Sequence, residues 1–166
     1  MIIVVFGLPG TGKSYFAQLL SERLGAVYIN SDKLRIVLTA RGMYNLEDKL
    51  KIYEAMAEEA KGTLTQGKDV VIDATFYKRA MISLFIRLAK DHAIPIVFIK
   101  IEADEKLIKE RLKKPRGDSE ADFGVYTKIK EEFEEPVVPY LRLRSEANNI
   151  DSMLESAISY MGNYHE

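Results

Sequence analysis

Residues 7–14 read Gly7-Leu8-Pro9-Gly10-Thr11-Gly12-Lys13-Ser14, the spacing G-x-x-x-x-G-K-[ST] of a phosphate-binding P-loop. The preceding residues 2–6 are apolar and mostly β-branched, which is typical of a buried strand. The following residues 13–24 place apolar side chains at helical spacing, namely Phe16, Ala17, Leu20 and Leu24. A strand, a glycine-rich loop and a helix in this order give the motif the structural context that its chemistry needs.

The chemistry of this loop follows from its residue types. Gly7, Gly10 and Gly12 allow the backbone to curl where a Cβ atom would clash, so that several N–H groups point inward at the start of a helix. Lys13 adds a positive charge for the β- and γ-phosphates, and the Ser14 hydroxyl is a ligand for Mg²⁺. We therefore expect residues 7–15, Tyr15 included, to bind ATP with Mg²⁺.

Composition excludes several classes of protein. The 166 residues are 47% hydrophobic and 30% charged, as in an ordinary globular domain. The formal net charge of −1 argues against a broad electrostatic footprint for nucleic acid, although a local basic groove is compatible with it. The sequence contains no cysteine, which excludes disulfides and thiolate catalysis. Its apolar runs are strand-sized and Met1 leads directly into one of them, so we expect a cytoplasmic protein without a membrane partner.

The rest of the chain alternates strands with helices. After 2–6, strands are predicted at 26–29, 70–74, 94–101 and 140–144, the last of which also suits a helix or loop. Helices are predicted at 13–24, 33–40, 46–66, 78–92, 104–114, 122–133 and 150–161. This order predicts an α/β fold, the three-layer sandwich of P-loop NTPases, with about five parallel strands and helices on both faces. We expect one domain over 1–166, with a short basic lid at roughly 111–124.

A carboxylate and a guanidinium follow the second strand. Asp32 and Arg35 are three residues apart, so they share one face of a helix. Transfer of a phosphoryl group to a hydroxyl needs a base for the acceptor's proton and a cation that holds an anionic acceptor in line. Asp32 suits the first task and Arg35 the second. The alternative is structural, because Asp32 is also a common helix-capping residue and Arg35 its surface partner.

A second carboxylate ends the third strand. Asp73 closes a buried apolar run and should lie beside the P-loop, because ligands bind at the carboxyl ends of parallel strands. A carboxylate there can hold the water shell of Mg²⁺ or fix Ser14, so Ser14 and Asp73 form the predicted metal site. Thr75 and Arg79 follow on the same rim and are candidates for binding the acceptor; Thr75 is equally suited to capping the next helix.

A basic segment forms the predicted lid. Residues 111–117 combine Arg111, two lysines and Arg116 with a proline and a glycine. Such a segment can fold over bound phosphates, and an arginine delivered in this way offsets charge on the transferring group. We expect Arg111 or Arg116 to do so, and the sequence does not choose between them. The alternative is a solvated helix end whose cations interact favourably with the helix dipole.

Three motifs together resemble a known family. The P-loop, residues 30–35 (Asn-Ser-Asp-Lys-Leu-Arg) and residues 71–75 (Val-Ile-Asp-Ala-Thr) are similar to those of small P-loop kinases, and closest to the branch of polynucleotide 5′-hydroxyl kinases, zeta toxins and seryl-tRNA kinases. Residues 119–122 (Ser-Glu-Ala-Asp) are also similar to that branch. The resemblance implies that Asp32 is the general base, that Arg35 and Thr75 bind the acceptor, and that lid arginines contact ATP. The chain departs from the polynucleotide members at Phe76, where they often have asparagine.

The sequence therefore predicts an ATP-dependent kinase that acts on a hydroxyl, with a polynucleotide 5′ end as the best single acceptor. A kinase for a small metabolite or a nucleoside is the alternative, in which Tyr44 and the helix at 46–66 wall the acceptor pocket. A nucleotide-dependent switch is disfavoured because no N-K-x-D guanine motif is present. An AAA-type motor is disfavoured because Ala74, and no glutamate, follows Asp73.

Overall fold

The computed structural model describes residues 1–39, 45–114 and 122–164. Its elements follow in the order β1 (Ile2–Phe6), α1 (Lys13–Leu24), β2 (Val27–Asn30), α2 (Ser31–Thr39), α3 (Leu46–Leu64), β3 (Val70–Asp73), α4 (Arg79–Asp91), β4 (Ile96–Ala103), α5 (Glu105–Leu112), α6 (Phe123–Glu132), β5 (Leu141–Ser145) and α7 (Ile150–Gly162). Within the described ranges, five parallel strands form one sheet in the order β2-β3-β1-β4-β5. The predicted fold class is confirmed.

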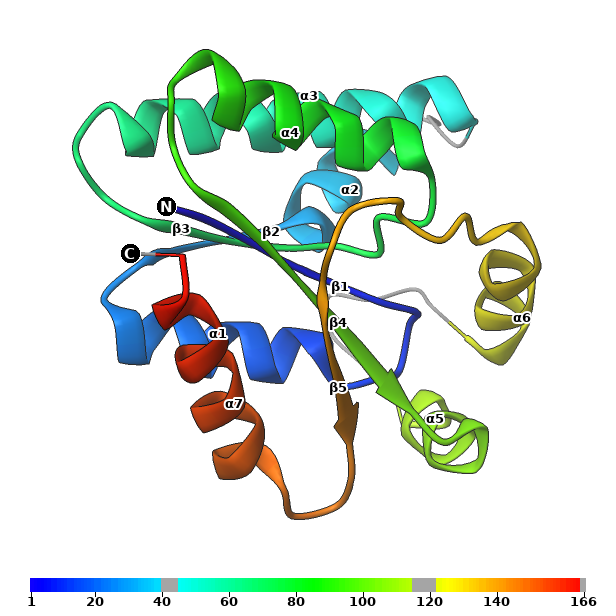
Figure 1. Ribbon diagram of the computed structural model, residues 1–166. Helices are drawn as coiled ribbons and strands as arrows, with labels where there is room; N and C mark the ends of the chain where they lie inside the picture. The colour runs from blue at the N-terminus through cyan, green and yellow to red at the C-terminus, as the bar shows by residue number, and fades with distance from the viewer. Residues whose placement is uncertain (40–44, 115–121, 165–166) are drawn as a thin grey trace.

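Helices cover both faces of the sheet, with α3 and α4 on one side and α1 and α7 on the other (Figure 1). The central strand β1 is buried along its whole length, because it lies between two strands and two helical layers. Its alternate side chains enter different cores: Ile2, Val4 and Phe6 pack with α3 and α4, whereas Ile3 and Val5 pack with α1 and α7. Period-two alternation on a doubly covered strand therefore reads as a continuous apolar run.

Figure 1 also shows where α5 and α6 lie, beside the carboxyl end of β4 and away from the two main helical layers. The segment between them, residues 115–121, contains Arg116 and half of the predicted lid and lies outside the described residues. The same holds for residues 40–44 and thus for Tyr44.

The predicted element boundaries differ from the observed ones by at most two residues. The strand predicted at 94–101 is β4, Ile96–Ala103. It starts later because Ala93 adopts a φ of 52° in a turn before Pro95, and it extends further because Glu102 and Ala103 pair with Arg144 and Ser145 of β5. The uncertain segment at 140–144 is the strand β5, since its backbone pairs in parallel with β4. The helix α2 starts at Ser31, two residues before its predicted start.

No helix in the described part of the chain is both long enough and apolar enough to span a bilayer.

Candidate active site

The P-loop joins β1 to α1 and depends on glycine at its two ends. Gly7 has a φ of 146°, and a Cβ atom there would lie 2.3 Å from the carbonyl oxygen of Ile101. Gly12 immediately precedes α1 with a φ of 86°, in the left-handed region that favours glycine. The Thr11 hydroxyl donates a 2.9 Å hydrogen bond to the Leu8 carbonyl and closes the curve. The loop therefore presents its backbone N–H groups at the positive end of a helix dipole, as the sequence predicts.

Asp73 lies at the end of β3, 1% exposed, and receives two hydrogen bonds on one carboxylate oxygen. The Tyr28 hydroxyl donates to Oδ2 over 2.6 Å, and the Asn30 amide donates to the same atom over 2.8 Å. The other oxygen, Oδ1, is buried and has no hydrogen-bond partner among the described residues. An unsatisfied buried carboxylate oxygen is unfavourable unless a ligand completes it.

Several neighbouring groups, two of them in the P-loop, shift the pKa of the Asp73 carboxyl. Burial raises the pKa of its carboxyl, the nearby Lys13 ammonium lowers it, and hydrogen bonds from Tyr28 and Ser14 lower it further. The negative charge of Asp32 acts in the opposite direction and raises this pKa. The fold thus brings Lys13, Ser14, Asp32 and Asp73 into one electrostatic cluster, although α1, α2 and β3 supply them from separate parts of the chain.

These residues fit a magnesium ion. Mg²⁺ in nucleotide sites is held by one or two protein oxygens together with phosphates and waters, and the hydroxyl of Ser14 and the orphaned oxygen of Asp73 are such ligands. Among the described residues no group of three or more His, Asp or Glu side chains could hold a metal ion. Ser14 and Asp73 stay the predicted metal ligands.

Asp32 and Arg35 lie on the first turns of α2, beside this cluster. The backbone N–H of Asp32 donates to the Asn30 Oδ1 atom over 2.5 Å, so Asn30 supplies the capping hydrogen bond. The capping role is thus taken by Asn30, and the Asp32 carboxylate lies 3.9 Å from the Arg35 guanidinium. The two side chains therefore share one face, and that face is next to the carboxyl ends of β2 and β3.

Thr75 and Arg79 occupy different surroundings. Thr75 is 5% exposed, and its carbonyl oxygen accepts a 3.4 Å hydrogen bond from the Gly7 backbone, which fixes it against the P-loop. Arg79 is exposed at the start of α4, where its Nε atom donates to the carbonyl of Glu135 over 2.9 Å. Arg79 thus holds the segment after α6, and its role toward an acceptor stays a prediction.

A cavity of about 500 Å³ lies on the other side of the P-loop. Its walls come from the P-loop helix, from α5 and from the loop between β5 and α7: Gly12, Tyr15, Arg111, residues 145–150 and Met153. Arg111 spans it, with its guanidinium donating to the Ser145 hydroxyl over 3.2 Å and lying 3.5 Å from the Gly10 carbonyl oxygen. The predicted lid arginine Arg111 therefore does reach the P-loop, whereas Arg116 lies outside the described residues.

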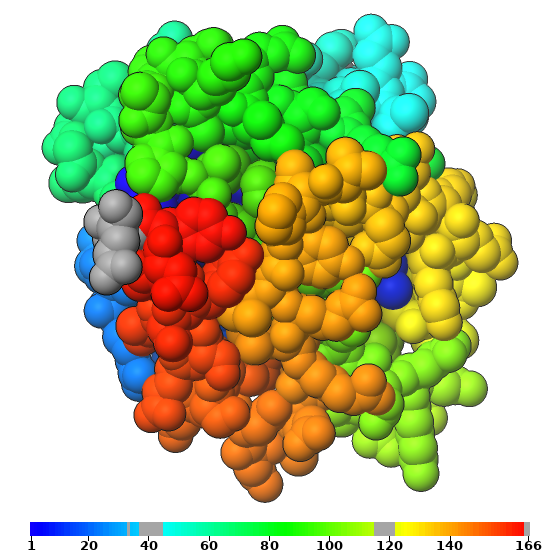
Figure 2. Space-filling model, in the orientation of Figure 1, coloured from blue at the N-terminus to red at the C-terminus, as the bar shows by residue number. Residues whose placement is uncertain are grey.

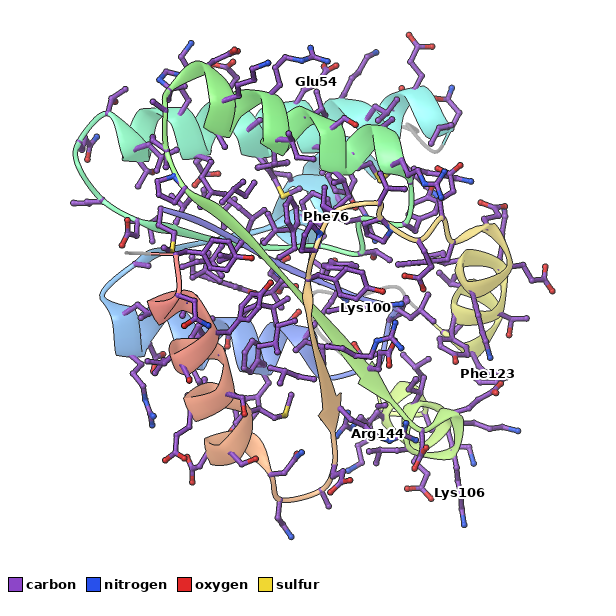
Figure 3. The ribbon with its side chains drawn as sticks, viewed as in Figure 1. Glu54, Phe76, Lys100, Lys106, Phe123 and Arg144 are labelled. Carbon is purple, nitrogen blue, oxygen red and sulfur yellow. The ribbon has the colours of Figure 1, made fainter. Side chains whose placement is uncertain are left out.

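A second, smaller hollow of about 250 Å³ lies beneath α5 and α6. Leu8 and Thr11 form part of its lining, and Figure 2 shows atoms of the N-terminal segment (blue) between the orange segment that precedes β5 and the yellow helix α6. Lys100 of β4, labelled in Figure 3, lies in the same wall and bonds Glu135 over 2.5 Å.

Sequence reasoning missed Tyr28 and Asn30. Both hold Asp73, and Asn30 also caps α2. A signal was available, because residues two apart on a strand point to the same face, and Asn30 is directly opposite Asp73 in the β2–β3 register. The residues of the β5–α7 loop were missed as well, since no motif marks them.

Comparison with known proteins agrees with this geometry. A family model described as "AAA domain" matches residues 2–136. A relative named "Putative adenylate kinase" from Thermococcus kodakarensis is 36% identical over 125 residues, which are 75% of this chain and 61% of the relative. The chain thus spans about three fifths of the length of that relative. It also matches an uncharacterized protein of Mycobacterium tuberculosis with 29% identity over 133 residues, 72% of this chain and 27% of that protein.

Solved structures of similar fold include kinases. A sugar kinase from Janibacter sp. HTCC2649 superposes with a TM-score of 0.76 and 17% identity, covering 97% of this chain and 94% of that one. The APS kinase of Mycobacterium tuberculosis superposes with a TM-score of 0.73 and 20% identity, covering 97% and 96%. At these identities the likeness shows the fold alone.

Proposed function

Since the chain belongs to the AAA domain family of P-loop kinases, we propose that it transfers the γ-phosphoryl group of ATP to a hydroxyl group of an acceptor. The observation that carries this proposal is the position of Asp32. Its carboxylate lies close enough to raise the pKa of Asp73, which the Lys13 ammonium and the Ser14 hydroxyl of the P-loop lower. A carboxylate so close to the phosphate loop, with its own backbone already capped by Asn30, is well placed to accept a proton.

The proposed reaction balances without any further reactant. The acceptor oxygen attacks the γ-phosphorus in line with the leaving β-phosphate oxygen; the new O–P bond forms as the bond to ADP breaks. Asp32 takes the acceptor's proton. The Lys13 ammonium and the P-loop amides stabilise the charge that moves onto the β-phosphate oxygens. Arg35, 3.9 Å from Asp32, holds the acceptor in line.

Ser14 and Asp73 would hold Mg²⁺, which when bound neutralises charge on the β- and γ-phosphates. Tyr28 and Asn30 hold the Asp73 carboxylate through Oδ2, which leaves the buried Oδ1 atom without a hydrogen-bond partner among the described residues. We place the nucleoside of ATP in the cavity between Tyr15, Arg111 and the β5–α7 loop, because this cavity opens directly beside Gly12. Arg111, and also Arg116, remain the proposed cations for the transferring phosphate.

The acceptor that the sequence favours is a polynucleotide 5′-hydroxyl group, and the alternative is a small metabolite or nucleoside. The names of the Thermococcus relative and of the solved sugar and APS kinases support small acceptors. A phosphate acceptor, as in an adenylate kinase, would need no base, because a phosphate oxygen attacks without losing a proton. A non-catalytic, nucleotide-dependent switch is the third and least favoured function.

The test is a transfer assay with radiolabelled ATP against 5′-hydroxyl DNA and RNA, nucleosides, AMP, sugars and sugar acids. We expect one hydroxyl acceptor to be phosphorylated, and Asp32→Asn to slow this transfer by roughly 10²- to 10⁴-fold with little change in ATP affinity. Asp91→Asn, an exposed change at the end of α4, is the matched control. Normal transfer by Asp32→Asn, or transfer only to the phosphate of AMP, would refute the hydroxyl mechanism.

A further inference from the structure

Tyr77, just after β3, lies between two ammonium groups. The Nζ atom of Lys49 on α3 is 5.3 Å from the centre of its ring, and that of Lys78 is 5.6 Å from it. Lys49 also donates a 3.2 Å hydrogen bond to the Tyr77 hydroxyl. Because that hydroxyl accepts from Lys49, its own proton remains available for donation to another group. Tyr77 is 4% exposed, whereas Lys49 and Lys78 are half-buried beside it.

A third cation approaches the same place from α2. Arg35 lies close enough to influence the pKa of Lys49, of Tyr53 and of Tyr77. Its Nε atom is buried and has no hydrogen-bond partner among the described residues, and its ion pair with Asp32 is long at 3.9 Å. Arg35 therefore has an unused donor, Nε, and its charge also acts on Tyr77.

These positive charges are incompletely balanced. Burial lowers the pKa of the Lys49 ammonium, and the positive charges of Arg35 and Lys78 lower it further. The negative charge of Glu132 acts in the opposite direction and raises this pKa. Of the neighbours that act most on Lys49, two are thus cations and one is an anion. Burial also raises the pKa of Tyr77, which keeps its hydroxyl protonated and able to donate. Partly buried cations that repel each other gain when an anion enters among them.

The cluster is built on a rigid and strained support. Phe76, labelled in Figure 3, has a φ of 49°, which is rare for a bulky side chain. Its backbone N–H donates to the buried Tyr53 hydroxyl over 3.0 Å, and its ring packs edge-to-face against Tyr53 and Phe85. This turn joins Thr75, which contacts the P-loop, to Tyr77. Strained residues of this kind persist where the surrounding structure fixes a functional geometry.

We propose that Arg35, Lys49 and the Tyr77 hydroxyl form an anion site that binds a carboxylate or phosphate group of a small acceptor. Arg35 is one helical turn from Asp32, which activates the hydroxyl group of the same acceptor. This inference rests on the proposed kinase function and specifies its substrate class as an alcohol that carries an acid group. The site holds a single anionic group. A polynucleotide would instead need a row of cations along an exposed groove, and the net charge of −1 does not favour such a groove.

The test measures binding apart from turnover. With the P-loop saturated by a non-hydrolysable ATP analogue and Mg²⁺, glycerol 3-phosphate, gluconate, glycerol, glucose and a 5′-hydroxyl oligonucleotide are titrated in turn. The ammonium resonance of Lys49 is followed by NMR and assigned by its loss in Lys49→Gln. We expect an acid, glycerol 3-phosphate or gluconate, to shift this resonance, and its neutral counterpart to leave it unmoved at tenfold higher concentration.

Variants then identify the contacts. We expect Lys49→Gln and Tyr77→Phe to weaken binding of that acid by about tenfold, as loss of one charge-assisted hydrogen bond predicts. Lys51→Gln is the matched control, because Lys51 is on the same helix but half exposed and pairs with Asp48. Equal affinity for acid and neutral compounds, equal effects of Lys49→Gln and Lys51→Gln, or a response to the oligonucleotide alone would each overturn the proposal.

The two proposals can fail separately. Lys49-dependent acid binding without phosphoryl transfer to any acceptor would refute the kinase function and leave the anion site intact. Transfer to a neutral alcohol that Lys49→Gln does not slow would refute the anion site and leave the kinase function intact.

Discussion

The Tyr28 hydroxyl donates a 2.6 Å hydrogen bond to the Asp73 carboxylate, joining β2 to β3 at the edge where the phosphate loop lies. Tyr28 is itself fixed by Asn30, whose amide is 2.5 Å from the Tyr28 oxygen. Burial and the neighbouring Asp73 charge raise the pKa of Tyr28, so it stays a donor at any physiological pH. Tyr28 is therefore a positioning residue for Asp73.

Tyr28→Phe removes this donor and keeps the ring. The hydrogen bond lowers the pKa of Asp73, so its loss raises that pKa, and the acid limb of the pH–rate profile should move to higher pH. We expect Mg²⁺-dependent ATP binding to weaken about tenfold, measured by calorimetry at fixed pH, since a hydrogen bond to a charged group contributes about 1.5–3 kcal/mol. Tyr164→Phe removes a hydroxyl from the α7 end, where it pairs with Tyr160, and should change neither quantity.

Asp73→Asn should separate stability from function. The folded pKa of Asp73 lies above its ordinary value of 3.8, so its contribution to stability is complete below that value and is lost as pH rises through the folded pKa. Asparagine does not ionise, so the Asp73→Asn variant does not lose stability in this way as the pH rises. In the absence of metal and nucleotide we expect it to be more stable than the parent at pH 8 but not at pH 3.5, by about 1.4 kcal/mol for each unit of raised pKa. Urea unfolding in EDTA measures this.

With Mg²⁺ and ATP added, the order should reverse, because only the parent chain retains the carboxylate that the metal needs. If the parent and Asp73→Asn proteins had equal free energies of unfolding at both pH values, the pKa of Asp73 would not be raised in the folded state.

Lys13→Ala removes the P-loop ammonium. A lost charge-assisted contact of about 1.5–3 kcal/mol corresponds to roughly 10- to 150-fold weaker ATP binding, measured by calorimetry. Lys90→Ala, an exposed lysine in the last turn of α4, is the control. Parental ATP affinity in Lys13→Ala would reject residues 7–15 as the nucleotide site.

Phe76→Ala tests the strained turn behind the acceptor side. Its ring is fully buried, with ring centres 4.8 Å from Tyr53 and 5.3 Å from Phe85. Truncation should cost about 3–5 kcal/mol in the free energy of unfolding, because a cavity is left between the rings of Tyr53 and Phe85. Val137→Ala, at an 83% exposed position, should change it by less than about 0.5 kcal/mol. A loss below about 1 kcal/mol for Phe76→Ala would show that the turn relaxes once the ring is gone.

Residues 2–14 by themselves predicted the phosphate loop, and the alternation of strands and helices along the chain predicted the fold class. An apolar β-branched run, glycines that adopt positive φ at Gly10 and Gly12, and an amphipathic helix are local properties, and local backbone sterics suffice to form the loop. The carboxylates Asp32 and Asp73 could be predicted to lie beside this loop, because parallel strands bring their carboxyl ends to one edge of the sheet.

The partners of these residues depend on sheet order and packing, which no local pattern encodes. Tyr28 meets Asp73 because β2 lies next to β3, 45 residues further along the chain. Arg111 meets Ser145 because β5 lies next to β4. Lys49 and Tyr77 meet because α3 packs over the turn after β3. Side-chain contacts between distant segments arise only when the whole core is buried, so sequence alone predicted the phosphate loop, whereas the folded chain defined the groups around it.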